Sequence, residues 1–143
     1  MRQVLDELTL KRRLPVLGVC VGMQIMANSS GEGQMHGLGW IDGVVKKLEP
    51  LKLIYTTFLP HMGWNNIQPI KETCLFKNID SDSRFYFLHS YYFQCKKENM
   101  LATTDYGGEF TSAVNSGNIF GVQFHPEKSH QWGIRLLENF ARL

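Results

Sequence analysis

Leu17-Gly18-Val19-Cys20-Val21-Gly22-Met23-Gln24 is the stretch that decides the fold. An apolar run from Pro15 to Val19 stops at a cysteine set between two near glycines, and helix-compatible residues continue from Met23 to Ala27. This order predicts a strand, a sharp turn and a helix. Because glycine has no side chain, strand and helix can approach each other closely while the central residue is held exposed in a strained turn.

Cys20 is the candidate nucleophile of this turn. The pattern Gly-x-nucleophile-x-Gly would place it at a helix N-terminus, where free N–H groups and the helix dipole favour a thiolate. The N–H of Val21 would face an oxyanion that forms on an attacked carbonyl. A buried strand cysteine followed by a glycine-bearing turn fits the same residues, so the rest of the chain has to separate the two interpretations.

The composition is that of one globular domain over residues 1–143. Hydrophobic residues make up 43% and charged residues 20%, which is enough apolar material for a real core. The net charge of +2 gives no footprint for nucleic acid or an anionic membrane. The chain shows no transmembrane window and no signal-peptide core, so a cytoplasmic location is expected. Three cysteines without a Cys-x-x-Cys pattern favour one reactive thiol, with no metal and no cofactor.

Periodicity along the chain predicts alternating helices and strands. The expected helices cover residues 1–13 and the apolar stripe from Trp132 to Leu143. The expected strands cover residues 40–48, 51–55, 84–89, 100–106, 109–115 and 118–124, the last two joined by a hairpin. Together with the strand–cysteine–helix unit, they predict an α/β fold: a three-layer sandwich on a mostly parallel central sheet.

The segment Pro60-His61-Met62-Gly63-Trp64-Asn65 is the second notable stretch. It combines a histidine, an aromatic residue and an amide in a stretch punctuated by proline and glycine, which favours a loop that presents side chains to a partner or ligand. A turn whose Trp64 fills the local core is the alternative.

The third notable stretch is His125-Pro126-Glu127, at the end of the last predicted strand. Residues i and i+2 of an extended chain point to the same side, so His125 and Glu127 would project together. A carboxylate that holds one ring nitrogen fixes the histidine tautomer and stabilises the imidazolium, as a base that serves a nucleophile requires. An exposed histidine and glutamate at a strand end are the structural alternative.

Taken together, Gly18 to Gln24 and His125-Pro126-Glu127-Lys128-Ser129 resemble the two signatures of class I (triad) glutamine amidotransferases. The segments Pro60 to Asn65, Phe87-Leu88-His89-Ser90-Tyr91-Tyr92 and Gly133 to Phe140 are more particular. They are similar to the glutaminase subunits of imidazole glycerol phosphate synthases, and the likeness covers nearly the whole chain.

The resemblance implies that L-glutamine is hydrolysed to glutamate and ammonia through a thioester on Cys20. His125 would be the base and Glu127 would orient it. Gln24 and the backbone at Val21, Ser90 and Tyr91 would hold the substrate. The residues that the resemblance places toward the partner interface are His61, Met62, Gly63, Trp64 and Asn65.

The resemblance also implies a partner, a separate (β/α)8-barrel cyclase subunit in a heterodimer. It would receive the ammonia and make imidazole glycerol phosphate and AICAR in histidine biosynthesis. Three alternatives stay open: a cyclase-like partner in surface-sugar biosynthesis, a free hydrolase of the same superfamily, and a catalytically silent partner-binding module.

Members of this family have several β/α units before the nucleophile strand, whereas Cys20 follows one predicted helix. The resemblance therefore leads us to expect that an N-terminal part is lacking, with its strands and one loop of the oxyanion hole. Losing one oxyanion donor costs on the order of 10² to 10³ in rate. Residues 1–143 alone are expected to be poorly stable and nearly inactive.

Overall fold

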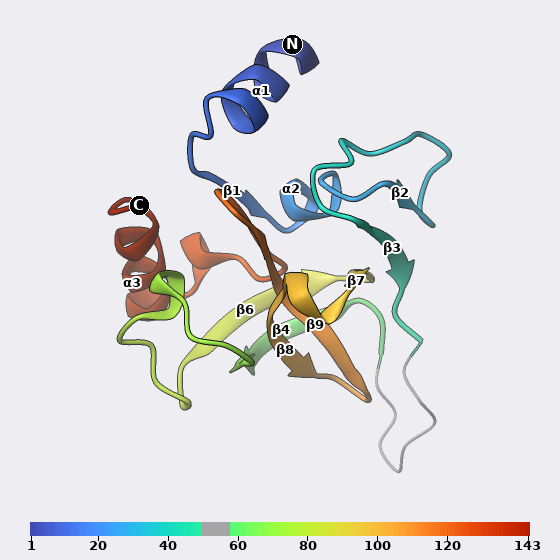
Figure 1. Ribbon diagram of the computed structural model, residues 1–143. Coiled ribbons are helices and arrows are strands. Elements are labelled where there is room, and N and C mark those ends of the chain that lie inside the picture. The colour runs from blue at the N-terminus through green and yellow to red at the C-terminus, as the bar shows by residue number, and fades with distance from the viewer. Residues whose placement is uncertain (50–57) are drawn as a thin grey trace.

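The computed structural model describes residues 1–49 and 58–143 of the chain (Figure 1). The strand predicted over residues 51–55 lies outside the described residues. The helical segments are α1 (Arg2–Asp6), the π-helix η1 (Glu7–Lys11), α2 (Val21–Gln24), the 3-10 helices η2 (Cys74–Phe76), η3 (Lys97–Asn99) and η4 (Pro126–Lys128), and α3 (His130–Phe140). The strands are β1 (Val16–Val19), β2 (Ser29–Ser30), β3 (Gly43–Lys47), β4 (His61–Asn66), β5 (Gln68–Pro69), β6 (Arg84–His89), β7 (Tyr91–Cys95), β8 (Met100–Asp105), β9 (Glu109–Ser116) and β10 (Ile119–Val122).

The largest sheet among the described residues has five strands in the order β1-β10-β9-β8-β5. Strand β1 runs parallel to β10, with Val19 opposite Val122. The remaining pairings of this sheet are antiparallel. The α/β class is confirmed, but the expectation of a mostly parallel sheet does not hold for these strands. The reason is that β8, β9 and β10 follow one another through tight connections, which can join only antiparallel neighbours.

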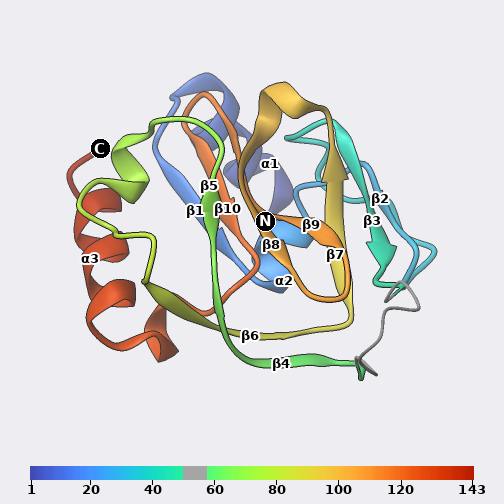
Figure 2. The ribbon, with the colours of Figure 1, turned by 90° about the horizontal axis from the view of Figure 1, so that it is seen from below.

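The strand β10 separates two apolar layers because its side chains alternate between the faces of the sheet. Phe120 packs edge-to-face against Phe140 of α3, with ring centroids 6.2 Å apart. A Cβ atom at Gly121 would lie 2.4 Å from Cγ of Met23, which belongs to α2. Figure 2 shows α3 on one side of the sheet and the layer of β2, β3 and β7 on the other. The chain therefore forms three layers with a core on each side of the sheet.

Strands β4 and β6 form a separate antiparallel ribbon, in register from His61 opposite His89 to Asn66 opposite Arg84. The loop predicted at residues 60–65 is therefore wrong. Its pattern misleads because polarity is inverted: His61 is buried, whereas Met62 and Trp64 point outward. A strand normally shows apolar residues on its buried side, so this segment gives no ordinary strand signal.

No helix among residues 1–49 and 58–143 is long and apolar enough to cross a membrane. The helix predicted at residues 1–13 is present as α1 followed by η1, and the predicted C-terminal helix is present as α3.

Candidate active site

The turn at Cys20 has the strained geometry that its sequence predicts. Cys20 has φ 53° and ψ −111°, a region that residues with a side chain rarely occupy. Its N–H donates to the Val122 carbonyl at 2.8 Å, and its carbonyl accepts the N–H of Met23 at 3.0 Å. The turn is thus held from β10 on one side and from the first turn of α2 on the other.

The two glycines beside Cys20 have different roles. A Cβ atom at Gly18 would lie 2.5 Å from the carbonyl oxygen of Gly22, a backbone atom that cannot give way. A Cβ atom at Gly22 would meet no atom of the described residues within 4 Å. The close approach of strand and helix therefore requires glycine at position 18 and does not require it at position 22.

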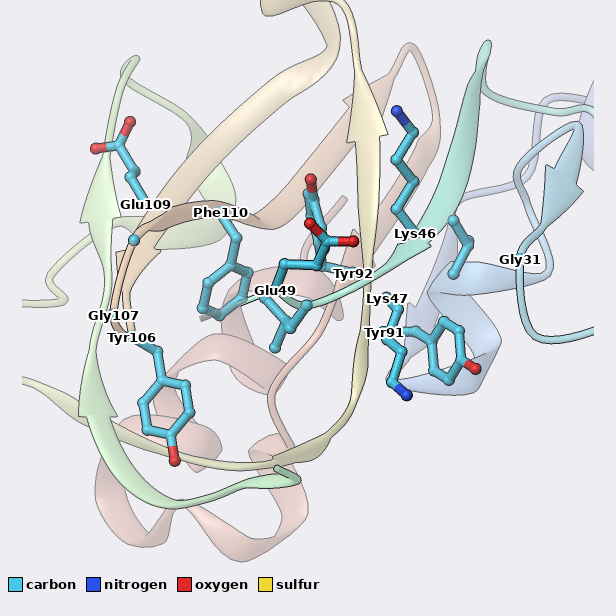
Figure 3. A pocket seen from close by; sticks show the side chains of 13 residues that line it. Gly31, Lys46, Lys47, Glu49, Tyr91, Tyr92, Tyr106, Gly107, Glu109 and Phe110 are labelled. Carbon is cyan, nitrogen blue, oxygen red and sulfur yellow. The ribbon is translucent and has the colours of Figure 1, made fainter. Parts of the chain in front are cut away.

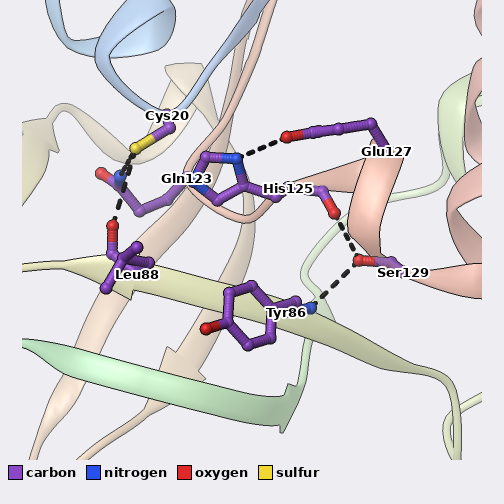
Figure 4. A network of polar contacts seen from close by, with 7 residues as sticks. All are labelled: Cys20, Tyr86, Leu88, Gln123, His125, Glu127 and Ser129. Atoms are coloured by element: carbon purple, nitrogen blue, oxygen red, sulfur yellow. Dashed lines mark hydrogen bonds and ion pairs between the residues drawn. The ribbon is translucent and has the colours of Figure 1, made fainter.

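The thiol of Cys20 lies in a small set of weak polar contacts (Figure 4). Its Sγ donates to the Leu88 carbonyl at 3.8 Å and accepts from Nε2 of Gln123 at 3.6 Å. Burial raises the pKa of the Cys20 thiol above its ordinary value of 9.0. The Glu127 carboxylate adds to this rise, while the Val21 N–H and the Gln123 amide lower the pKa in part. Contrary to the expectation of a thiolate, Cys20 rests as a thiol and needs a base.

His125, the predicted base, follows β10, the strand that accepts the hydrogen bond from the Cys20 turn. Nδ1 of His125 pairs with Oε1 of Glu127 at 2.7 Å, and in Figure 4 the imidazole lies between the Cys20 sulfur and the Glu127 carboxylate. The backbone holds the ring in place. The His125 N–H donates to the Tyr86 carbonyl at 2.8 Å, and the Ser129 hydroxyl donates to the His125 carbonyl at 2.6 Å. Because the carboxylate occupies Nδ1, Nε2 is the ring nitrogen that would accept the proton of the thiol.

A cavity of about 360 Å³ opens beside the thiol. Its lining includes Cys20 and the predicted substrate-binding residues Val21, Gln24, Ser90 and Tyr91. These residues come from α2 and from the junction of β6 with β7, which are far apart in the sequence. The structure therefore brings together the residues predicted to bind the substrate.

Strand β4 divides the residues predicted at the partner interface between its two sides. The side chains of Met62 and Trp64 are 64% and 43% exposed, whereas His61 is 2% exposed. Gly63 and Asn65 are half-buried. Met62 and Trp64 are thus available to a partner. His61 is not, because strand alternation turns its ring inward against Phe87 and Tyr106.

Comparison with known proteins identifies the family of this chain. The family described as "Glutamine amidotransferase class-I" matches residues 2–143. The chain belongs to this family.

Two curated relatives of this glutamine amidotransferase domain carry the name "Imidazole glycerol phosphate synthase subunit HisH". The one from Leptospira borgpetersenii is 52% identical over 99% of the chain and 70% of its own length. The one from Bdellovibrio bacteriovorus is 49% identical over 100% of the chain and 71% of its own length. A crystal structure of a glutamine amidotransferase from Thermotoga maritima has a TM-score of 0.62 at 18% identity, over 99% of the chain and 52% of that protein. The chain thus spans about half the length of that solved structure.

The amidotransferase site contains residues that the sequence analysis missed. Gln123 is fully buried, donates to the Cys20 sulfur and accepts from Nε2 of Gln24 at 3.0 Å. Ser129 is the second such residue: its hydroxyl donates to the His125 carbonyl and accepts from the Tyr86 N–H. The sequence pattern could have identified Gln123 as a site residue. It is the only polar side chain between Ile119 and Phe124, and it lies two residues before His125, on the same side of an extended chain.

A second, larger cavity of about 640 Å³ lies between β3, β7 and the turn from β8 to β9 (Figure 3). Charged and phenolic side chains surround it, among them Lys46, Lys47, Glu49 and Glu109, and its lining contains no cysteine or histidine among residues 1–49 and 58–143. It therefore lacks the nucleophile and base that amidotransferase chemistry needs. Within the described parts of the chain, no group of three or more histidine, cysteine, aspartate or glutamate side chains could hold a metal ion.

Proposed function

We propose that this chain hydrolyses L-glutamine to glutamate and ammonia through a thioester on Cys20. The observation that carries the proposal is the meeting of two distant segments. A cysteine in a strained turn lines a cavity, and a histidine already oriented by a carboxylate at 2.7 Å stands at the end of the neighbouring strand. Nucleophile, base and orienting carboxylate are the parts that acyl transfer needs.

In the first half of the reaction, Sγ of Cys20 attacks the carbonyl carbon of the glutamine side chain. His125 accepts the thiol proton and passes it to the leaving nitrogen, so the C–N bond breaks and ammonia departs. The raised pKa of the Cys20 thiol makes this proton transfer necessary. The Val21 N–H, at the start of α2, stabilises the oxyanion that forms in between.

In the second half, His125 takes a proton from water, which attacks the thioester carbonyl. The C–S bond breaks, glutamate leaves, and the proton returns to the Cys20 sulfur. Glu127 keeps Nδ1 of the ring occupied in both halves, so that the same nitrogen of His125 faces the reacting atoms each time. Gln24, Ser90 and Tyr91 line the cavity in which the amino acid would bind.

We further propose that the ammonia passes to a separate (β/α)8-barrel cyclase subunit. The names of the two curated relatives support a partner, since each is called a subunit of imidazole glycerol phosphate synthase. The outer side of the β4–β6 ribbon supports a docking place, because Met62, Trp64 and Leu88 are exposed there. Leu88 also supplies the carbonyl that accepts from the Cys20 thiol. The same residue therefore has its side chain on the outer surface of the ribbon and its backbone at the cavity.

The test measures glutamate release by the purified chain with and without its cyclase subunit, together with labelling by a diazo-ketone analogue of glutamine. We expect label on Cys20 and none on Cys74 or Cys95, and we expect turnover that rises strongly when the cyclase is present. Equal turnover without any partner would support a free hydrolase instead. Partner binding without label on Cys20 would support a silent binding module.

A further inference from the structure

Two buried histidines of the β4–β6 ribbon have no part in the proposed chemistry, and one of them, His89, lines the cavity beside Cys20, called the glutamine cavity below. His61 of β4 and His89 of β6 are opposite each other in the ribbon and are 2% and 6% exposed. Nδ1 of His61 lies 3.0 Å from Nε2 of His89. Nδ1 of His89 lies 2.8 Å from the Tyr91 carbonyl oxygen, and Nε2 of His61 lies 3.4 Å from the Asn65 amide nitrogen.

The Tyr91 carbonyl oxygen determines the direction of each hydrogen bond in the row that runs from Asn65 through the two histidines to Tyr91. A carbonyl can only accept, so His89 must donate from Nδ1. Burial lowers the pKa of His89 to about 4 and that of His61 to about 3, so both rings are neutral near pH 7. A neutral imidazole has one donor, so Nε2 of His89 accepts from Nδ1 of His61, and Nε2 of His61 accepts from Asn65.

The rings have little freedom to leave this arrangement. The His61 ring is stacked between Tyr106, at 3.9 Å between centroids, and Phe87, at 4.7 Å. The His89 ring lies against Phe87 and Phe110. A ring that is packed on both faces cannot turn over. Its donor nitrogen therefore stays in place and fixes the position of the group to which it donates.

That group is central to the cavity. The Tyr91 carbonyl accepts from Nδ1 of His89 and also from Nε2 of Gln24, at 2.9 Å. Both of its lone pairs are thereby used, and it holds Gln24 rather than the substrate. Gln24 in turn contacts Gln123, which donates to the Cys20 sulfur. The place of Gln24 in the glutamine cavity thus depends on a carbonyl that His89 anchors.

We propose that His61 and His89 are positioning residues that relay the position of strand β4 to the Tyr91 carbonyl, and through it to Gln24 in the glutamine cavity. Asn65 begins this relay on the strand that also presents Met62 and Trp64 outward. Neither histidine needs to touch the reacting atoms. This inference rests on the proposed glutaminase function and names a means by which a partner on β4 would affect glutamine binding.

The experiment compares three substitutions at one site in the complex with the cyclase subunit. His61→Phe keeps a flat ring between Phe87 and Tyr106 but removes the donor to His89. His61→Asn places an amide near the position of Nδ1 and retains that donor. His61→Gln, of similar polarity, places its amide near the position of Nε2 and loses it. His36→Gln, at an exposed histidine outside the row of contacts from Asn65 to Tyr91, is the control.

We expect His61→Phe to raise KM for glutamine about 10-fold with little change in kcat, because a buried acceptor on His89 is left unpaired while the reacting groups stay in place. His61→Asn should restore a KM near that of the unchanged chain, and His61→Gln should not. Protection of Cys20 by glutamine against the diazo-ketone analogue should follow the same order without depending on turnover. His36→Gln should change neither quantity.

Equal KM values for the unchanged chain and His61→Phe would overturn the relay alone. So would equal effects of His61→Asn and His61→Gln, since a merely structural role does not distinguish which nitrogen is replaced. Should His61→Phe fail to show a cooperative thermal transition, the Asn and Gln pair decides the question. A complex of the unchanged chain that releases no glutamate and takes no label on Cys20 would instead overturn the proposed function.

Discussion

The turn at Cys20 and the ribbon of β4 and β6 depart from ordinary structure in opposite ways. The turn concentrates strain at one residue, with φ 53° and a helix backbone pressed against Gly18. The ribbon has regular register but inverted polarity, with His61 inside and Trp64 outside. Strain suits a residue that must be exposed to react, whereas inverted polarity suits an element that contacts different surroundings on each side.

The largest effect should come from removing the reactive atom of the turn. Cys20→Ala should lower glutamate release about 10⁴-fold or more, because no other thiol in the described part of the chain lines the cavity and the covalent route is lost. Thermal unfolding should change little, since the thiol makes only weak contacts. Cys74→Ser, at an exposed cysteine, is the matched control and should keep full activity in the same assay. Substantial turnover by Cys20→Ala would exclude the thioester.

A second substitution tests the geometry of the turn without touching the thiol. Gly18→Ala should lower the free energy of unfolding by about 3 kcal/mol, because its methyl group would overlap the Gly22 carbonyl 2.5 Å away. Gly22→Ala, in open space, should change stability by less than about 0.5 kcal/mol. Urea unfolding of the two variants measures the difference. Equal stability of both would show that strand and helix can separate at no cost.

The two histidines on the inner side of the ribbon should make the free energy of unfolding depend on pH in the acidic range. His61 and His89 have pKa values lowered to about 3 and about 4, while in the unfolded chain they take up protons near pH 6.5. The unfolded state therefore binds more protons below pH 6.5, and stability must fall as the pH decreases from there toward 4. We expect a loss of several kcal/mol from these two groups together.

Urea unfolding at several pH values measures this loss. His61→Phe removes one of the two groups, so its stability should depend less steeply on pH over the same range. His36→Gln should follow the unchanged chain. A parallel pH dependence for His61→Phe and the unchanged chain would show that these rings are not held neutral.

The outer side of the ribbon should give the smallest effect on the chain itself. Trp64→Ala should weaken binding of the cyclase subunit about 10-fold, as expected for an exposed aromatic anchor. Thermal stability should fall slightly, because the indole stacks on His130 with ring centroids 5.0 Å apart. Ile134→Ala, at a 60% exposed position on α3, is the matched control. Isothermal titration of the two variants gives the comparison. Equal affinities would move the proposed interface away from β4.

Short-range patterns made part of the fold and of the site predictable. The strand, turn and helix around Cys20, the hairpin of β9 and β10 and the C-terminal helix all depend on neighbours within a few residues. The pairing of His125 with Glu127 follows from extended backbone in the same way. The expectation of a mostly parallel sheet does not hold for the described strands, because parallel or antiparallel pairing depends on two segments together. Here the hairpin connections among β8, β9 and β10 made their pairings antiparallel.

Other parts depended on contacts between distant residues. Strand β4 has its strand form because it pairs with β6, from His61 opposite His89 to Asn66 opposite Arg84, whereas its own residues predict a loop. The raised pKa of the Cys20 thiol arises from burial by the surrounding elements, which outweighs the helix N-terminus that suggested a thiolate. The link from Asn65 through two histidines to Tyr91 likewise joins residues that no local pattern connects.

By itself, the sequence determined where the chain turns, which cysteine stands at the turn and which carboxylate accompanies His125, because backbone conformation and i, i+2 spacing are local properties. Tertiary structure alone decided that Gln123 contacts the thiol, that His61 faces inward, and that Met62 and Trp64 face outward. The physical reason is that burial, pKa and hydrogen-bond direction are set by the atoms that surround a group, and most of those atoms come from distant parts of the chain.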